Sequence, residues 1–75
     1  MVADTYRDKQ GRTCAHLHRT GHGYYTWRGL VIYVRCAGDW VAVRAAVDWS
    51  TVVAAWTLRS MRLALGALAE KEERE

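Results

Sequence analysis

The stretch from Asp48 to Ala69 constrains the fold most, because it is the longest part of the chain that keeps one periodicity. Asp48 suits the N-cap of a helix, where a carboxylate accepts hydrogen bonds from free backbone N–H groups. Val47 and Val52 have the spacing of a hydrophobic staple around that cap. These signals predict a helix over about residues 48–70, which at 1.5 Å per residue spans roughly 33 Å. The charged tail, residues 70–75, has glutamates that oppose the helix dipole, so we expect it to fray.

Placed at 100° per residue, the predicted helix has two apolar stripes instead of one. A helix that covers a sheet needs a single apolar stripe. The second stripe repeats every seven residues, the spacing at which a packed helical partner makes contact. The alternative is a helix buried on more than one side of a small core. We predict a homodimer whose oligomer interface consists of Trp49, Trp56 and Leu63.

The residues before the helix, about 5–46, have the pattern of short antiparallel strands. Residues 12–20 alternate with a period of two, and residues 24–37 are rich in aromatic and β-branched side chains. Residues 21–23 predict a turn, Gly29 a bend or bulge, and Gly38-Asp39 a two-residue hairpin. We therefore expect a single α+β domain over residues 1–75. It would be a small antiparallel sheet of three to four strands, followed by one long C-terminal helix packed on it.

Composition excludes some classes of protein. The chain has 75 residues, of which 51% are hydrophobic, and four Trp and four Tyr, so it is not a disordered chain. Its net charge of +3 favours acidic partners only mildly. The polar N-terminal segment does not resemble a signal peptide, so we expect a cytoplasmic protein with reduced thiols. We expect no membrane span, because Arg59 and Arg62 near the middle of the apolar stretch cost about 2.5–3.5 kcal/mol each on insertion.

Aromatic and basic side chains alternate along residues 24–37. If that segment is one strand, its aliphatic positions face the core and its aromatic positions face solvent. An exposed aromatic patch marks a binding surface, although such residues also shield small cores. We predict partner binding by Tyr25, Trp27, Tyr33 and Arg35. The alternative is a nucleic-acid surface, in which aromatic rings stack on bases and phosphates meet Arg12, Arg19, Arg28 and Arg35.

One cluster has metal-ligand chemistry. On a strand, Cys14, His16 and His18 project from the same face, and these are residue types that bind zinc. The spacing matches no paired Cys-x-x-Cys signature, and a polar strand face with an inert cysteine explains it as well. A Cys–His nucleophile pair is formally possible, but no oxyanion hole or orienting carboxylate has a recognisable spacing. We predict no catalytic residues and no cofactor.

These features together favour a small non-enzymatic interaction protein that binds and modulates a host macromolecule through an aromatic and basic sheet face. Nine of the eleven Lys and Arg residues are Arg, and Ala and Val are frequent, which suggests GC-rich codons. We therefore expect a phage or mobile-element product of a high-GC bacterium. The alternatives are a nucleic-acid-binding regulator and a metal-binding protein that uses the Cys-x-His-x-His strand.

Overall fold

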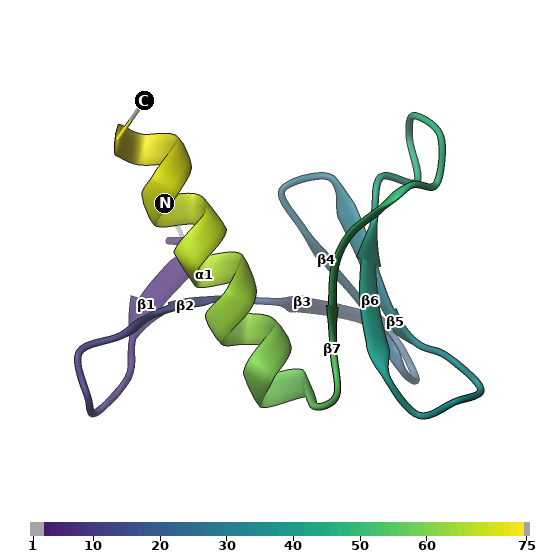
Figure 1. Cartoon of the computed structure of the whole chain (residues 1–75), viewed down its shortest axis with the longest axis horizontal. Helices are drawn as coiled ribbons and strands as arrows, with labels where there is room; N and C mark the ends of the chain where they lie inside the picture. Colours follow the sequence, from purple (N-terminus) through teal and green to yellow (C-terminus); the bar gives the residue numbers. More distant parts are fainter. Residues whose placement is uncertain (1–2, 75) are drawn as a thin grey trace.

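The computed structural model describes residues 3–74, in which the chain forms seven strands and one C-terminal helix (Figure 1). The strands are β1 (Thr5–Arg7), β2 (Thr13–Ala15), β3 (His18–Gly21), β4 (Tyr24–Trp27), β5 (Leu30–Val34), β6 (Trp40–Val43) and β7 (Thr51–Ala55), and the helix is α1 (Leu58–Arg74). Strands β1 and β2 form a two-stranded antiparallel sheet. The other strands form a five-stranded antiparallel sheet in the order β3-β4-β5-β6-β7.

Each strand of the larger sheet pairs with the next strand along the chain, so the sheet is a meander. The turn between β4 and β5 consists of Arg28 and Gly29, whose φ angles are 46° and 79°. Positive φ at both central residues is the geometry of a type I′ turn, which matches the twist of a two-residue hairpin. Trp27 therefore pairs with Leu30, and Tyr25 pairs with Ile32.

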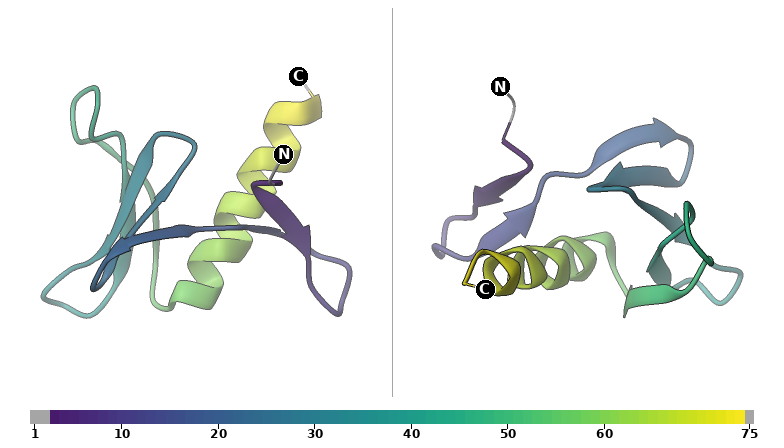
Figure 2. Two further views of the ribbon diagram at one scale, coloured as in Figure 1. Left: turned by 180° about the vertical axis from the view of Figure 1, so that it is seen from behind. Right: turned by 90° about the horizontal axis from the view of Figure 1, so that it is seen from above.

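The core lies between α1, β2 and one side of the five-stranded sheet. The helix contributes Met61, Leu65 and Ala69, all fully or almost fully buried, and the sheet contributes Ile32 and Ala42. Figure 2 shows that the sheet curls and that α1 and the β2–β3 segment close its open side. Two layers therefore enclose one continuous apolar core.

Gly66 determines how closely α1 approaches β2. A Cβ added at this position would lie 2.8 Å from the Cα of Cys14 and closer still to the carbonyl of Thr13. Only glycine permits this approach of helix backbone to strand backbone. The crossing brings β2 against the helix, although β2 is not part of the five-stranded sheet.

The predicted fold class is confirmed in outline, since the chain is α+β with antiparallel sheets and one C-terminal helix. The predicted single sheet of three to four strands is wrong. Residues 12–20 do not form one strand, because they separate into β2 and β3, which belong to different sheets. The predicted Gly38-Asp39 hairpin is a longer connection, residues 35–39, closed by the hydrogen bond of 2.8 Å from Arg35 N to Asp39 O.

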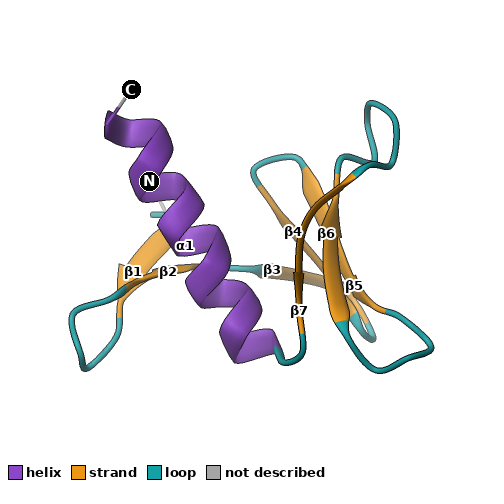
Figure 3. Ribbon diagram, viewed as in Figure 1, coloured by secondary structure: helices purple, strands orange, loops and turns teal. Residues whose placement is uncertain are grey.

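The predicted start of the helix at Asp48 is wrong, because α1 begins at Leu58 (Figure 3). Residues 51–55 instead form β7, which completes the sheet beside β6. The helix cap is Thr57, whose Oγ1 accepts a hydrogen bond of 3.0 Å from Ser60 N. Asp48 plays a related part in a loop, where its carboxylate accepts a hydrogen bond of 3.0 Å from Ser50 N.

In the segment where we expected fraying, residues 70–74 continue α1 to Arg74. Glu75 lies outside the described residues. Glu72 and Glu73 both pair with Arg28, at 3.4 and 3.7 Å, and Glu70 accepts a hydrogen bond from Thr13 Oγ1. These contacts from other elements offset the unfavourable interaction of the carboxylates with the helix dipole.

Candidate functional site

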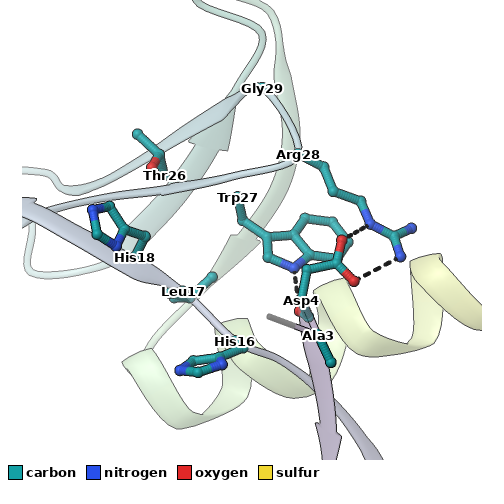
Figure 4. Close-up of a pocket in the computed structure, with 9 residues that line it drawn as sticks. All are labelled: Ala3, Asp4, His16, Leu17, His18, Thr26, Trp27, Arg28 and Gly29. Atoms are coloured by element: carbon teal, nitrogen blue, oxygen red, sulfur yellow. Dashed lines mark hydrogen bonds and ion pairs between the residues drawn. The ribbon is translucent and has the colours of Figure 1, made fainter. Parts of the chain in front are cut away.

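The first candidate site is a pocket of about 300 Å³ where the N-terminal segment meets β3 and the β4–β5 turn (Figure 4). The indole of Trp27 forms one wall and is only 4% exposed. Its Nε1–H donates a hydrogen bond of 2.7 Å to the backbone carbonyl of Asp4. The guanidinium of Arg28 lies 4.7 Å from the centroid of the Trp27 ring, a cation–π distance.

The charged groups of this pocket already have partners. Arg28 donates hydrogen bonds to both carboxylate oxygens of Asp4. These bonds lower the pKa of Asp4 from its usual value and raise the pKa of Arg28, so both stay ionised at neutral pH. A carboxylate held in this way is a poor proton donor. The cluster fastens the N-terminal segment, the β4–β5 turn and the end of α1 together, which is a structural role.

His16 and His18 also line the pocket, and both are exposed. They do not converge with Cys14, because Cys14 lies in β2 and is buried, whereas His18 begins β3. The Sγ of Cys14 lies 3.7 Å from the carbonyl of Arg12. Across residues 3–74, no three His, Cys, Asp or Glu side chains are grouped as a metal site requires. The second cysteine, Cys36, is exposed and free.

The four side chains predicted to bind a partner do not share one surface. Trp27 is buried in the core, and Tyr25 packs beside it with its ring 5.9 Å from that of Trp40. Tyr33 lies on the opposite side of the sheet, and Arg35 lies in the 35–39 loop. The type I′ turn at residues 28–29 causes this separation. Across a two-residue hairpin, the side chains that share one side of the sheet differ from those that would share a side of one continuous strand.

The arginines of the nucleic-acid alternative are mostly neutralised by neighbours. Arg12 pairs with Asp8 at 2.9 Å, and Arg28 pairs with Asp4. Arg35 pairs with Asp39, whose carboxylate is buried and whose pKa is lowered by the hydrogen bonds from Arg35. Of these four arginines, only Arg19 has no carboxylate partner among residues 3–74. Its guanidinium contacts Gly21 O and His22 Nδ1, both at 3.3 Å.

The second candidate site is the side of the five-stranded sheet that faces away from α1. Ile32 and Ala42 pair with each other and face the core, so their neighbours along β5 and β6 face the other way. Tyr24 and Tyr33 stack there with ring centroids 6.3 Å apart, and Tyr24 is 53% exposed. We call this side the helix-free face, and it consists of Tyr24, Tyr33, Val41, Ala54, Thr26, Val31, Val43 and Thr51. Val41 and Val43 are buried, at 1% and 2% exposed, so only the other six side chains are accessible. None of these side chains carries a charge.

A loop that connects β6 to β7, residues 44–50, projects at one end of this face. Figure 1 shows this loop and the 35–39 loop on the side of the sheet away from α1, one at each end. The loop is closed by a hydrogen bond of 3.0 Å from Arg44 N to Ser50 O. The carbonyl of Arg44 accepts further hydrogen bonds from the backbone N–H groups of Val47, Asp48 and Trp49, at 3.0–3.2 Å. The 44–50 loop is therefore well ordered by its own backbone.

This ordered loop exposes two large apolar side chains, Val47 at 77% and Trp49 at 62%. Trp49 has a φ of 61°, a conformation that bulky residues rarely adopt. The Oγ of Ser50 is buried and has no hydrogen-bond partner among the described residues. Sequence reasoning missed this loop, because Asp48 resembles a helix cap. The available signal was the spacing of Asp48 and Ser50, which also suits an Asx turn.

The residues predicted as an oligomer interface lie on three different elements. Trp49 is in the 44–50 loop, Trp56 lies between β7 and α1, and Leu63 is half-buried on α1. They cannot form one helical stripe, because α1 begins only at Leu58. Trp56 is 77% exposed, so its own surface remains open to a partner.

Comparison with known proteins assigns no family to this fold and these surfaces: no family model, no curated protein and no solved structure significantly matches the chain. Within the described part of the chain, no helix has the length and apolar content that a membrane crossing requires.

Proposed function

We propose that this protein is a non-enzymatic interaction protein, which binds a partner protein through the helix-free face and the 44–50 loop and occludes the surface that it covers. The observation that carries the proposal is Trp49, a largely exposed indole on a loop whose backbone holds it in a left-handed conformation. Backbone strain at an exposed, well-ordered position is characteristic of recognition sites.

The chemistry of the face favours a protein over a nucleic acid. Antiparallel sheets usually present polar side chains on their solvent side, but the accessible part of this face has the stacked Tyr24 and Tyr33 and no charged side chain. Nucleic-acid surfaces need cations near the phosphates. Tyr and Trp are the residue types that contribute most at protein interfaces. The partner is therefore expected to offer an apolar surface that accepts the rings of Trp49 and Tyr24.

The test is affinity capture followed by measurement of the dissociation constant with the purified partner. Trp49→Ala and Tyr24→Ala should each lose the captured protein, and Trp49→Ala should weaken binding by about 2 kcal/mol or more, roughly thirtyfold. Tyr6→Ala is the matched control, because Tyr6 is also an exposed aromatic residue but lies on β1, in the other sheet. This variant should bind as the wild type does.

Two outcomes would contradict the proposal. Capture that survives both Trp49→Ala and Tyr24→Ala would show that another surface binds. Capture that disappears after nuclease treatment, together with a steep loss of affinity between low and moderate salt, would indicate a nucleic-acid partner instead.

A further inference from the structure

A second pocket lies where one end of the five-stranded sheet meets the C-terminal half of α1. It has a volume of about 240 Å³ and is lined by the β4–β5 turn, the start of the 44–50 loop, β7 and α1. Trp27 and Arg28 also line the pocket drawn in Figure 4, where the side chain of Arg28 extends from the turn toward α1. Pockets for drug-sized molecules start at about 300 Å³. This pocket therefore suits a smaller molecule with one ring or one branched chain.

The walls of this pocket are apolar and continue the core. Leu30 and Leu68 pack against the core cluster that contains Trp27. Val52 is the extra residue at the register shift between β6 and β7, and such a bulge redirects a side chain. Leu30, Val52 and Leu68 are all half-buried and line the pocket. An apolar ligand would therefore cover apolar surface that water now contacts.

The two arginines that line the pocket differ in their partners. Arg28 is neutralised by Asp4 and by carboxylates of α1. Arg44 is exposed, and among residues 3–74 no carboxylate lies within ion-pair distance of it. Arg44 contributes only a minor part of the lowered pKa of Asp48, whose carboxylate instead accepts a hydrogen bond from Ser50 N. The positive charge of Arg44 is therefore free to meet a ligand.

We propose that this pocket binds a small carboxylate with an apolar ring or branched chain, whose acid group pairs with Arg44. The planar guanidinium can donate two parallel hydrogen bonds to a carboxylate, and the apolar part of the ligand lies against Leu30 and Leu68. A carboxylate is favoured over a phosphate dianion, because Glu72 lines the same pocket and repels a second negative charge. The site lies on the core side of the sheet, so it does not depend on the function proposed for the helix-free face.

The test uses 3-phenylpropionate as the carboxylate and 3-phenylpropan-1-ol as a neutral control of similar shape. Titrations are followed by NMR, through the indole N–H resonance of Trp27 and the backbone amides of Leu30, Arg44 and Leu68. The acid should bind with a Kd on the order of 1 mM, and the alcohol at least about tenfold more weakly.

Substitution of Arg44 tests the role of its charge. Arg44→Gln should reduce the affinity for the acid to that for the alcohol, whereas Arg44→Lys keeps the charge and should retain a preference for the acid. Arg59→Gln is the matched control, because Arg59 is an exposed arginine of α1 that does not line this pocket. This variant should bind both ligands as the wild type does.

Three outcomes would overturn the proposal. The first is the absence of a saturable shift at ligand concentrations of about 10 mM. The second is equal affinity for the acid and the alcohol, or an affinity for the acid that Arg44→Gln leaves unchanged. The third is a set of shifts centred on His16 and His18, which would place the ligand in the other pocket.

Discussion

The two sides of the five-stranded sheet are both apolar, but α1 covers only one of them. On the core side, Ile32 and Ala42 lie under Met61 and Leu65 of α1. On the helix-free face, β5 presents the half-buried Tyr33 and Val31, while Val41 and Val43 of β6 are buried. Antiparallel sheets of monomeric proteins usually alternate between apolar and polar sides. This sheet does not.

The proposed function divides the apolar residues of the sheet between stability and recognition. The core side supplies the burial that a small domain needs. The helix-free face keeps Tyr24 at the surface, and exposed apolar groups of this kind mark binding surfaces. A substitution on the core side should therefore change the stability of the fold. A substitution of an exposed residue of the helix-free face, such as Tyr24, should change binding and leave stability almost unchanged.

The largest effect is expected at Gly66. Gly66→Val places a branched side chain against the backbone of Thr13 and Cys14, so α1 can no longer approach β2. We expect a loss of about 3 kcal/mol or more in the free energy of unfolding, measured by urea denaturation. Ala67→Val is the control, because Ala67 is exposed on the same helix, and it should cost less than about 1 kcal/mol. Equal losses in the two variants would show that the helix–strand approach is not close.

A smaller effect is expected for the ion pair between Asp4 and Arg28. The pKa of Asp4 is lowered by its hydrogen bonds with Arg28, so its stabilising contribution is present above the unfolded pKa and is lost as pH falls through the folded pKa. Asp4→Asn should therefore lower the urea midpoint at neutral pH, and the variant and wild type should converge once the pH falls below the lowered pKa of Asp4. A difference that persists at acid pH would indicate a role for Asp4 other than its charge.

Asp48→Asn is the matched control for this pH dependence. The pKa of Asp48 is also lowered, chiefly by its contacts with Ser50, whose backbone N–H donates a hydrogen bond of 3.0 Å to the carboxylate. Asn can accept the same backbone hydrogen bond as Asp in a loop of this kind. The substitution should therefore change stability less than Asp4→Asn does at neutral pH.

The smallest effect on stability is expected on the helix-free face. Tyr24→Ser removes a stacked pair with Tyr33 at an exposed position, so we expect a loss of only about 0.5–1 kcal/mol. The variant should keep its far-ultraviolet circular dichroism spectrum. A loss as large as that of Gly66→Val would mean that this face is part of the stability of the fold, and the contrast between the two sides would fail.

The fold class could be predicted from the sequence because a β-rich half followed by a helical pattern dominates the chain. The turn at residues 21–23 and the C-terminal position of the helix follow from local signals. The start of the helix did not, because TVVAA also fits the helical periodicity of the residues that follow it. Pairing with β6 determines its structure, and such tertiary contacts override local propensity.

The candidate site was harder to predict for a related reason. The sides of the sheet on which Tyr25 and Tyr33 lie depend on the turn at residues 28–29. In the sequence, only Gly29 indicates a turn there. Arg28 adopts a positive φ although arginine does not favour it. Because this two-residue turn was not predicted, side chains on its two flanking strands were assigned to the same side of the sheet. Trp27 was predicted at the surface but is buried in the core.

The order of elements along the chain also has a consequence for folding. The helix that covers the core side is the last element, and it supplies Met61, Leu65 and Ala69. During synthesis all seven strands leave the ribosome before that helix does. Until α1 docks, the core side of the meander is open to other chains, which is the situation in which nascent sheets aggregate. Slow docking of α1 is therefore expected to favour aggregation over folding.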